Sequence, residues 1–260
     1  MKSLFAVLLL CVCATGLLRA QDFNGTMAWS ARIELTDPQA REQLSMAEEA
    51  LKNPALLSML LDNAQVRGLL EKQLGPINAN SGATSVLPTG FTLQIKGPRA
   101  LVKTEGGLVS REVLTLADKN TAYTLDRRAR TYQQLTEPAA AERSTAKVKV
   151  TRTHETATLL GYACRRYLVE TDDGGAKSRF SVWTTTELKA ANTTAFKRLQ
   201  WGEAGGADFL AQIEGVPLKI DATTPEAKIA LLATRITPGA LSDALFSLPA
   251  GFKETVPASR

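Results

Sequence analysis

The sequence predicts an α+β protein in which a strongly curved antiparallel sheet, a half-barrel, is covered by a helical lid. Three observations predict this class. Residues 91–188 form short apolar–polar alternating segments separated by polar turns, which is typical of an antiparallel meander. Residues 37–75, which precede the meander, instead have a helical period. Several expected strands are apolar on both faces, which indicates that something covers the second face of the sheet.

The first twenty residues have the features of a secretory signal peptide. Lys2 makes the start positive, residues 4–18 form an apolar core, and Ala20 is a small residue at the expected cleavage site. That core is too short to span a bilayer stably, and no later stretch is long and apolar enough to do so. We therefore expect a periplasmic protein that begins near Gln21 and has no transmembrane segment.

The expected domain organisation is simple. Residues 1–20 are the signal peptide, residues 21–255 form a single domain with a helical insertion at 37–75, and residues 256–260 form a flexible tail. The first strand is expected at 25–34, where apolar and polar residues alternate. Thr36-Asp37-Pro38 provides a helix cap followed by a proline suited to the first turn, and Asn53-Pro54 repeats this start signal.

The remaining elements follow from alternation and turn residues. Strands are expected at 91–96, 99–104, 110–117, 121–125, 131–135, 147–153, 155–159, 162–171, 177–185, 216–222 and 227–237. A helix is expected to begin at residue 196 or 207 and to end at 213. A short helical turn at 240–244 and an extended segment at 246–252 then close the domain.

The expected strand at 162–171 shows most clearly why a lid is predicted. Strict alternation places Tyr162, Cys164 and Leu168 on one face and Ala163, Tyr167 and Val169 on the other. Such a strand is apolar on both sides, so the helices of residues 38–74 are the natural cover for its second face.

A curved sheet under a lid encloses either a filled core or a cavity for an apolar ligand, and the sequence leaves both open. Trp29 is a candidate lining residue because it shares a face with Met27, an adaptable apolar side chain. The full set of candidate lining residues is Met27, Trp29, Phe91, Leu93, Leu57 and Leu61.

Nothing in the sequence favours catalysis, and no cofactor or metal site is expected. His154 is the single histidine, and it lies in a polar Arg-Thr-His-Glu run where a solvated side chain is the expectation. Neither GxSxG nor HExxH is present. The Asp172-Asp-Gly-Gly175 run lacks the spaced oxygen ligands of a calcium loop and is typical of a hairpin turn.

The three cysteines bear on lipidation and on disulfide pairing. Cys11 and Cys13 leave with the signal and follow large residues, so lipidation at either is not expected. Cys164 then remains as a buried small hydrophobe or, alternatively, as half of a disulfide between chains.

The formal net charge is only +5. The arginines of 127–130 lack interleaved aromatic residues, so we do not expect a nucleic-acid partner.

Several segments resemble an exported bacterial family of unknown function. They are Phe23-Asn-Gly-Thr26, Ile95-Lys-Gly-Pro-Arg99, Asp118-Lys-Asn-Thr-Ala-Tyr-Thr-Leu125 with Tyr132, Leu160-Gly-Tyr-Ala-Cys-Arg-Arg-Tyr167, Val182-Trp-Thr184, Gly215-Val-Pro-Leu218 and Phe246-Ser-Leu-Pro-Ala-Gly-Phe252. Members of this family are similar to the lipoprotein-carrier (LolA/LolB-like) superfamily, in which a curved sheet covered by helices holds acyl chains. This resemblance implies a non-catalytic periplasmic protein that binds a lipid, an acylated protein or another apolar ligand. The alternative is a structural or protein-interaction module of the envelope with a filled core and no ligand.

Overall fold

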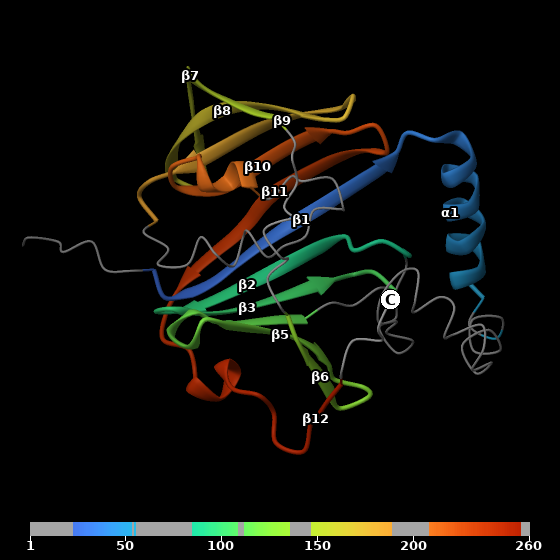
Figure 1. Ribbon diagram of the computed structural model, residues 1–260, viewed down its shortest axis with the longest axis vertical. Coiled ribbons are helices and arrows are strands. Elements are labelled where there is room, and N and C mark those ends of the chain that lie inside the picture. The colour runs from blue at the N-terminus through green and yellow to red at the C-terminus, as the bar shows by residue number, and fades with distance from the viewer. Residues whose placement is uncertain are drawn as a thin grey trace, which may run out of the picture.

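A computed structural model describes residues 23–53, 55, 85–108, 112–135, 147–188 and 208–255. In this part of the chain the dominant element is one twelve-stranded sheet (Figure 1). The expected signal peptide, the expected helix at 53–75 apart from its first residues, the start of the helix expected from residue 196, and the tail at 256–260 lie outside the described residues.

The strands match the expected segments closely. They are β1 (Gly25–Leu35), β2 (Gly90–Lys96), β3 (Arg99–Glu105), β4 (Glu112–Leu116), β5 (Thr121–Asp126), β6 (Thr131–Gln134), β7 (Lys147–Leu159), β8 (Tyr162–Asp173), β9 (Ala176–Thr185), β10 (Val216–Thr223), β11 (Ala227–Pro238) and β12 (Lys253–Glu254). The two segments expected at 147–153 and 155–159 are one continuous strand, β7.

Two meanders form the sheet and meet at its centre. The strand order is β12-β6-β5-β4-β3-β2-β1-β11-β10-β9-β8-β7. The N-terminal strand β1 therefore pairs with β2 on one side and with β11, the end of the second meander, on the other. Neighbouring strands are antiparallel except β12 and β6, which are parallel. The antiparallel sheet expected from the sequence is confirmed.

The predicted helical lid is wrong. Within the described residues the one α-helix is α1 (Pro38–Leu51), and the other helical segments are the short 3-10 turns η1 (Ala117–Lys119), η3 (Asp208–Ala211) and η4 (Asp243–Phe246). Figure 1 shows α1 beside the end of β1 and not across a face of the sheet. No helix in this part of the chain is both long and apolar enough to cross a membrane.

The apolar stripe of α1 is too narrow to cover a sheet. The expected cap is present, since Asp37 accepts a hydrogen bond from the backbone N–H of Ala40 at 2.9 Å. Of the expected stripe, however, Ala47 is exposed, Leu44 is half-buried and only Leu51 is buried. The periodicity thus predicted the helix correctly but not its role.

The main core lies on one face of the sheet and draws on both meanders. Its cluster of buried residues includes Met27 on β1, Leu93 on β2, Val182 on β9 and Leu218 on β10. Segment η3 packs on the same cluster, where the rings of Phe209 and Phe180 lie 4.7 Å apart. The same face of β1, β2 and β8 to β11 therefore forms one continuous apolar interior.

A second, smaller core lies on the opposite face of β3, β4 and β5. It consists of Leu101, Leu114, Leu116, Leu125 and Phe246, with partly buried Tyr123, Tyr132, Leu241, Leu245 and Leu248 packed against it. We call residues 241–255, which cover these strands, the C-terminal strap. Strands β3 and β4 are thus apolar on both faces, although residues 162–171 were the segment for which the sequence predicted this, and the strap and not a helical lid covers their second face.

Strand β8 is not apolar on both faces, contrary to the expectation. Cys164, Tyr167 and Val169 are all buried in the main core, whereas Leu168 is 38% exposed. The alternation breaks between Cys164 and Tyr167, opposite a register shift in the pairing of β7 with β8. Such an irregularity changes which residues face inward, so strict alternation assigned Tyr167 and Val169 to the wrong face.

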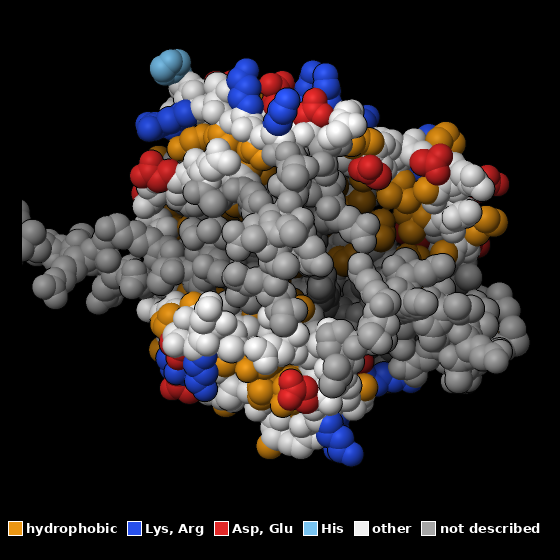
Figure 2. All heavy atoms as spheres, viewed as in Figure 1, with side chains coloured by type: hydrophobic (Ala, Val, Ile, Leu, Met, Phe, Trp, Pro, Cys, Tyr) orange, Lys and Arg blue, Asp and Glu red, His pale blue; other side chains and the backbone are white. Residues whose placement is uncertain are grey.

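The face of β7 to β11 and β1 that points away from the main core is exposed, and we call it the outer face. Leu168 and Leu232, which is 44% exposed, are its largest exposed apolar side chains. Figure 2 shows Lys and Arg side chains, with acidic side chains among them, along the edge of the molecule over β7 to β9. The outer face is therefore a surface with both charged and apolar groups.

Candidate functional site

The structure brings together four of the six candidate lining residues at the centre of the sheet. In the β1–β2 register, Met27 lies opposite Leu93 and Trp29 lies opposite Phe91. Their exposed fractions are 0% for Met27 and Leu93, 4% for Trp29 and 5% for Phe91. The other two, Leu57 and Leu61, lie outside the described residues.

Trp29 is the centre of this group. Its ring stacks on that of Phe91, with centroids 4.8 Å apart and planes at 8°. Its indole N–H donates a hydrogen bond to the backbone carbonyl of Pro217 on β10 at 3.2 Å. Because β11 lies between β1 and β10, the indole extends across β11, where the residue opposite Trp29 is the small Ala233. The aromatic side chain thus links three strands from within the core.

The reactive groups singled out in the sequence lie apart. His154 is exposed on the edge strand β7. Cys164 is 2% exposed and free of any disulfide, so the expected burial is confirmed. Burial in apolar surroundings raises the pKa of the Cys164 thiol. In the described part of the chain, no three His, Cys, Asp or Glu residues lie close enough together to hold a metal ion.

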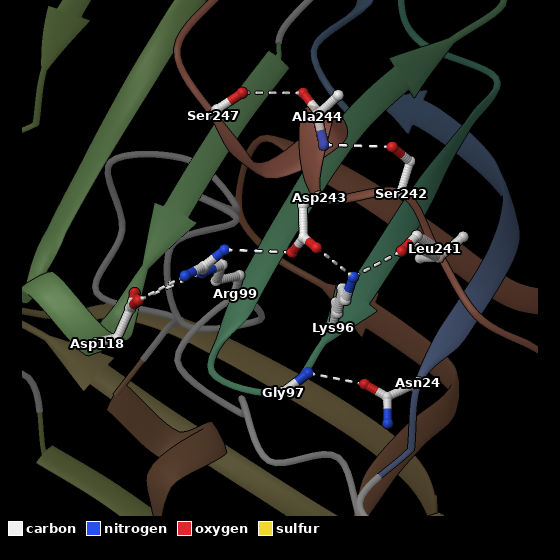
Figure 3. A network of polar contacts seen from close by, with 10 residues as sticks. All are labelled: Asn24, Lys96, Gly97, Arg99, Asp118, Leu241, Ser242, Asp243, Ala244 and Ser247. Atoms are coloured by element: carbon white, nitrogen blue, oxygen red, sulfur yellow. Dashed lines mark hydrogen bonds and ion pairs between the residues drawn. The ribbon is translucent and has the colours of Figure 1, made fainter.

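A polar network holds the start of the C-terminal strap to the turn between β2 and β3 (Figure 3). The Lys96 ammonium donates to the carbonyl of Leu241 at 2.9 Å and lies 3.0 Å from a carboxylate oxygen of Asp243. Arg99 bridges Asp243 at 3.5 Å and Asp118, beside the same turn, at 3.2 Å. The hydrogen bond from Lys96, followed by its charge, lowers the pKa of the Asp243 carboxyl.

The far end of the strap is held by a second set of contacts. The Arg127 guanidinium binds both carboxylate oxygens of the buried Glu112, at 2.6 and 2.8 Å, and lies 6.0 Å from the ring centroid of Phe252. The hydrogen bond to Glu112 raises the pKa of Arg127. Beyond Phe252, β12 pairs with β6. Both ends of the strap are therefore fixed, and the second core lies between them.

Reasoning from the sequence missed these strap contacts. The segment 246–252 was expected to be extended and to close the domain, but its place on the second face was not expected. The spacing of Leu241, Leu245 and Leu248 could have indicated the strap, because the sequence reasoning named no surface against which these three leucines pack. The charged residues of the network give no pattern in the sequence, because Lys96, Asp118 and Asp243 are far apart along the chain.

The fold and these contacts define a protein built on one open antiparallel sheet, with an apolar core on one face and a C-terminal strap on part of the other. The family model described as a domain of unknown function (DUF4412) matches residues 91–252, which is more than half of the chain. The chain belongs to this family. The match begins in β2 and ends at Phe252, so it includes the network at the start of the strap and the contact of Arg127 with Phe252, but not β12.

Two further comparisons add little. No curated protein matches the chain significantly. A solved structure of PNGF-II is similar with a TM-score of 0.40 and 14% sequence identity, over 89% of this chain and 30% of that one. The chain thus spans less than a third of that protein, and a similarity at this TM-score carries no argument about fold or function. Neither finding confirms the resemblance to the lipoprotein carriers.

Proposed function

We propose that this chain is an exported, non-catalytic protein of the bacterial envelope, with a filled core, that acts through its exposed surface. The observation that carries the proposal is the burial of Met27, Trp29, Phe91 and Leu93, of which none is more than 5% exposed. Side chains that line an open ligand cavity retain surface toward that cavity. These four instead pack against one another and against the backbone of β10.

The experiment that tests a filled core is native mass spectrometry of the protein purified after export without detergent. We expect a single species with the mass of the polypeptide alone. A stoichiometric lipid or other apolar molecule that co-purifies with the protein would overturn this proposal.

Binding of an apolar ligand is the second candidate function, and the same measurement distinguishes it. It is supported by the stacked pair of Trp29 and Phe91, with Met27 on the same face, because large aromatic and adaptable thioether side chains are typical of apolar binding sites. To reach them, a ligand would have to displace side chains of the main core.

Export itself is tested by N-terminal sequencing of the protein recovered from the periplasmic fraction. We expect the first residue to be near Gln21. Recovery of the intact chain in the cytoplasm would contradict the proposed location without affecting the assignment of a filled core.

A further inference from the structure

A row of alternating cationic and apolar residues crosses the outer face. In the registers of β8 to β11, Arg166 lies opposite Trp183, Trp183 opposite Lys219, and Lys219 opposite Leu232. Directly opposed residues on antiparallel strands share a face and lie in contact range. With neighbouring strands about 4.8 Å apart, the row is roughly 15 Å wide.

The first half of this row is rigid. The Arg166 guanidinium bonds to the Ser181 hydroxyl at 2.8 Å and to the Glu155 carboxylate at 2.8 Å. It also lies 5.9 Å from the ring centroid of Trp183, within the range of a cation–π contact. The arginine and the indole are therefore held in place before any partner binds.

Beside this row, two further rows carry an excess of positive charge. Across β7, β8 and β9 the register aligns Lys149, Glu170 and Arg179 in one row and Lys147, Asp172 and Lys177 in the next. In each row one acid lies between two cations. Lys149 and Arg179 both lie within ion-pair distance of Glu170, at 4.0 and 3.8 Å, and their side chains are 76% and 81% exposed. One acid cannot balance two cations, so this row presents a net positive charge to an external partner.

The apolar side chains and this excess charge lie on one continuous face. Along β8, Glu170, Leu168 and Arg166 alternate with buried residues and lie on the outer face, so Leu168 lies between the other two. Leu168 and Leu232 are among the few large apolar residues that the described part of the chain leaves exposed. Figure 2 shows the charged side chains of this region projecting from the molecule.

We propose that the outer face docks on the surface of an anionic phospholipid bilayer. Lys147, Lys149 and Lys177 would lie against lipid phosphates, while Leu168 and Leu232 enter the interfacial layer. Long cationic side chains keep their charge at the headgroups while their stems cover apolar surface, and tryptophan favours the same interface. The proposal rests on the proposed function only for the envelope location, since this face is separate from the core.

Two other partners fit this face less well. A single-stranded nucleic acid needs several aromatic rings for successive bases, whereas the row holds one tryptophan with Arg166 beside its ring. Protein interfaces are depleted in lysine and glutamate, and both are prominent on this face. The opposite charge of an anionic bilayer complements the lysines, and its interfacial layer accepts the leucines.

The test is co-flotation of the purified protein with vesicles. We expect binding to vesicles of equal parts phosphatidylglycerol and phosphatidylcholine, little binding to phosphatidylcholine alone, and release at high salt. The variant with both Lys147→Gln and Lys149→Gln should lower the partition coefficient about 25-fold, about fivefold for each charge, which corresponds to about 1 kcal/mol each. Lys253→Gln, on exposed β12 at the other edge of the sheet, is the matched control and should bind as the parent does.

The apolar contribution has its own pair of variants. Leu168→Ser and Leu232→Ser should each lower binding about fivefold, because only part of each side chain is available for burial. Met46→Ser removes a 59% exposed apolar side chain from α1, away from the outer face, and should leave binding unchanged. Circular dichroism verifies that every variant is folded.

Several outcomes would overturn the proposal. They are equal binding to neutral and anionic vesicles, equal losses in the control and outer-face variants, or no flotation by the folded parent protein. Binding of a single-stranded oligonucleotide or a protein by this face without vesicle binding would equally refute it. A lipid found inside the protein by native mass spectrometry would refute the filled core and leave this result standing, so the two proposals fail separately.

Discussion

Substitution of Trp29 tests directly whether the centre of the sheet is packed core or the wall of a ligand site. Truncation of a buried tryptophan to alanine costs about 3–5 kcal/mol, through lost burial and the cavity left behind. Since Trp29 is 4% exposed, stacked on Phe91 and bonded to the Pro217 carbonyl, we expect Trp29→Ala to lie in that range. Most small domains have about 5–15 kcal/mol of stability, so this variant should unfold at a much lower urea concentration.

Milder variants separate the contribution of the Trp29–Pro217 hydrogen bond from that of the stacked rings. Trp29→Phe keeps an aromatic ring for Phe91 but leaves the Pro217 carbonyl without its donor, so we expect a loss of about 1–3 kcal/mol. A double-mutant cycle of Trp29→Leu and Phe91→Leu should give a coupling energy of about 0.5–1.5 kcal/mol for the stacked pair.

The assay is urea unfolding followed by far-ultraviolet circular dichroism, since removal of a tryptophan alters the fluorescence signal itself. Leu232→Ala, at an exposed apolar position, is the control and should change stability by less than about 0.5 kcal/mol. If Trp29→Ala changed stability as little as this control does, Trp29 would not be core. The position would then line space that a ligand normally fills, and the filled-core argument would fail.

Three further predictions concern the turns and the strap. Leu160 has a positive φ of 52° and is 46% exposed, so Leu160→Asn should raise the free energy of unfolding by about 0.5–1 kcal/mol in urea titrations, and a decrease would refute the assigned turn. Glu112→Gln removes the carboxylate that Arg127 binds in a buried position, so it should cost about 1–3 kcal/mol, and an unchanged unfolding midpoint would contradict this. Because Lys96 lowers the pKa of Asp243 in the folded state, the stabilising contact is present above the ordinary carboxyl pKa and is lost as pH falls through the lowered value. The protection factors of strap amides, which compare the exchange rate with the intrinsic rate at the same pH, should therefore fall in acid for the parent protein, whereas Asp243→Asn should show no such loss.

Local patterns predicted most of the strands because each follows from a few adjacent residues. The expected strands at 91–96 and 99–104 differ by one residue from β2 and β3. The turn expected at Asp118-Lys-Asn120 is present as η1, followed by Asn120 with a φ of 49°, a conformation that asparagine tolerates. Alternation, turn residues and caps are all properties of short segments, so they are visible without the fold.

What could not be predicted is what covers each face, since that depends on contacts between distant segments. Leu101 and Leu114 indicate a buried second face, but the residue that covers them, Phe246, lies more than a hundred positions later. A helix was the natural expectation because an amphipathic segment adjoins the meander. The strap residues are few and mostly not helical, so no periodicity marks them.

The candidate site was predicted only in part, because some of its contacts also join segments that are distant in the sequence. Met27 and Trp29 share a face by strand geometry alone, and their pairing with Leu93 and Phe91 follows once β1 and β2 are neighbours. The hydrogen bond from Trp29 to Pro217 could not be foreseen, because β10 becomes a near neighbour only through the return of the second meander to β1.

The register break in β8 connects the corrected fold with the proposed surface. If alternation had continued through residues 164–169, Leu168 would lie in the core and Tyr167 and Val169 would be on the outer side. The irregular stretch of β7 between Arg152 and Thr156 instead accompanies a switch that puts Leu168 outside, beside Arg166 and across from Ser181. The same switch buries Tyr167 and Val169, which are 6% and 0% exposed, and leaves Leu168 on the outer face in exchange. An apolar residue exposed beside Arg166, with Lys149 and Arg179 on the two neighbouring strands, suits the proposed docking face, and Leu168→Ser should therefore weaken vesicle binding while barely changing the urea midpoint.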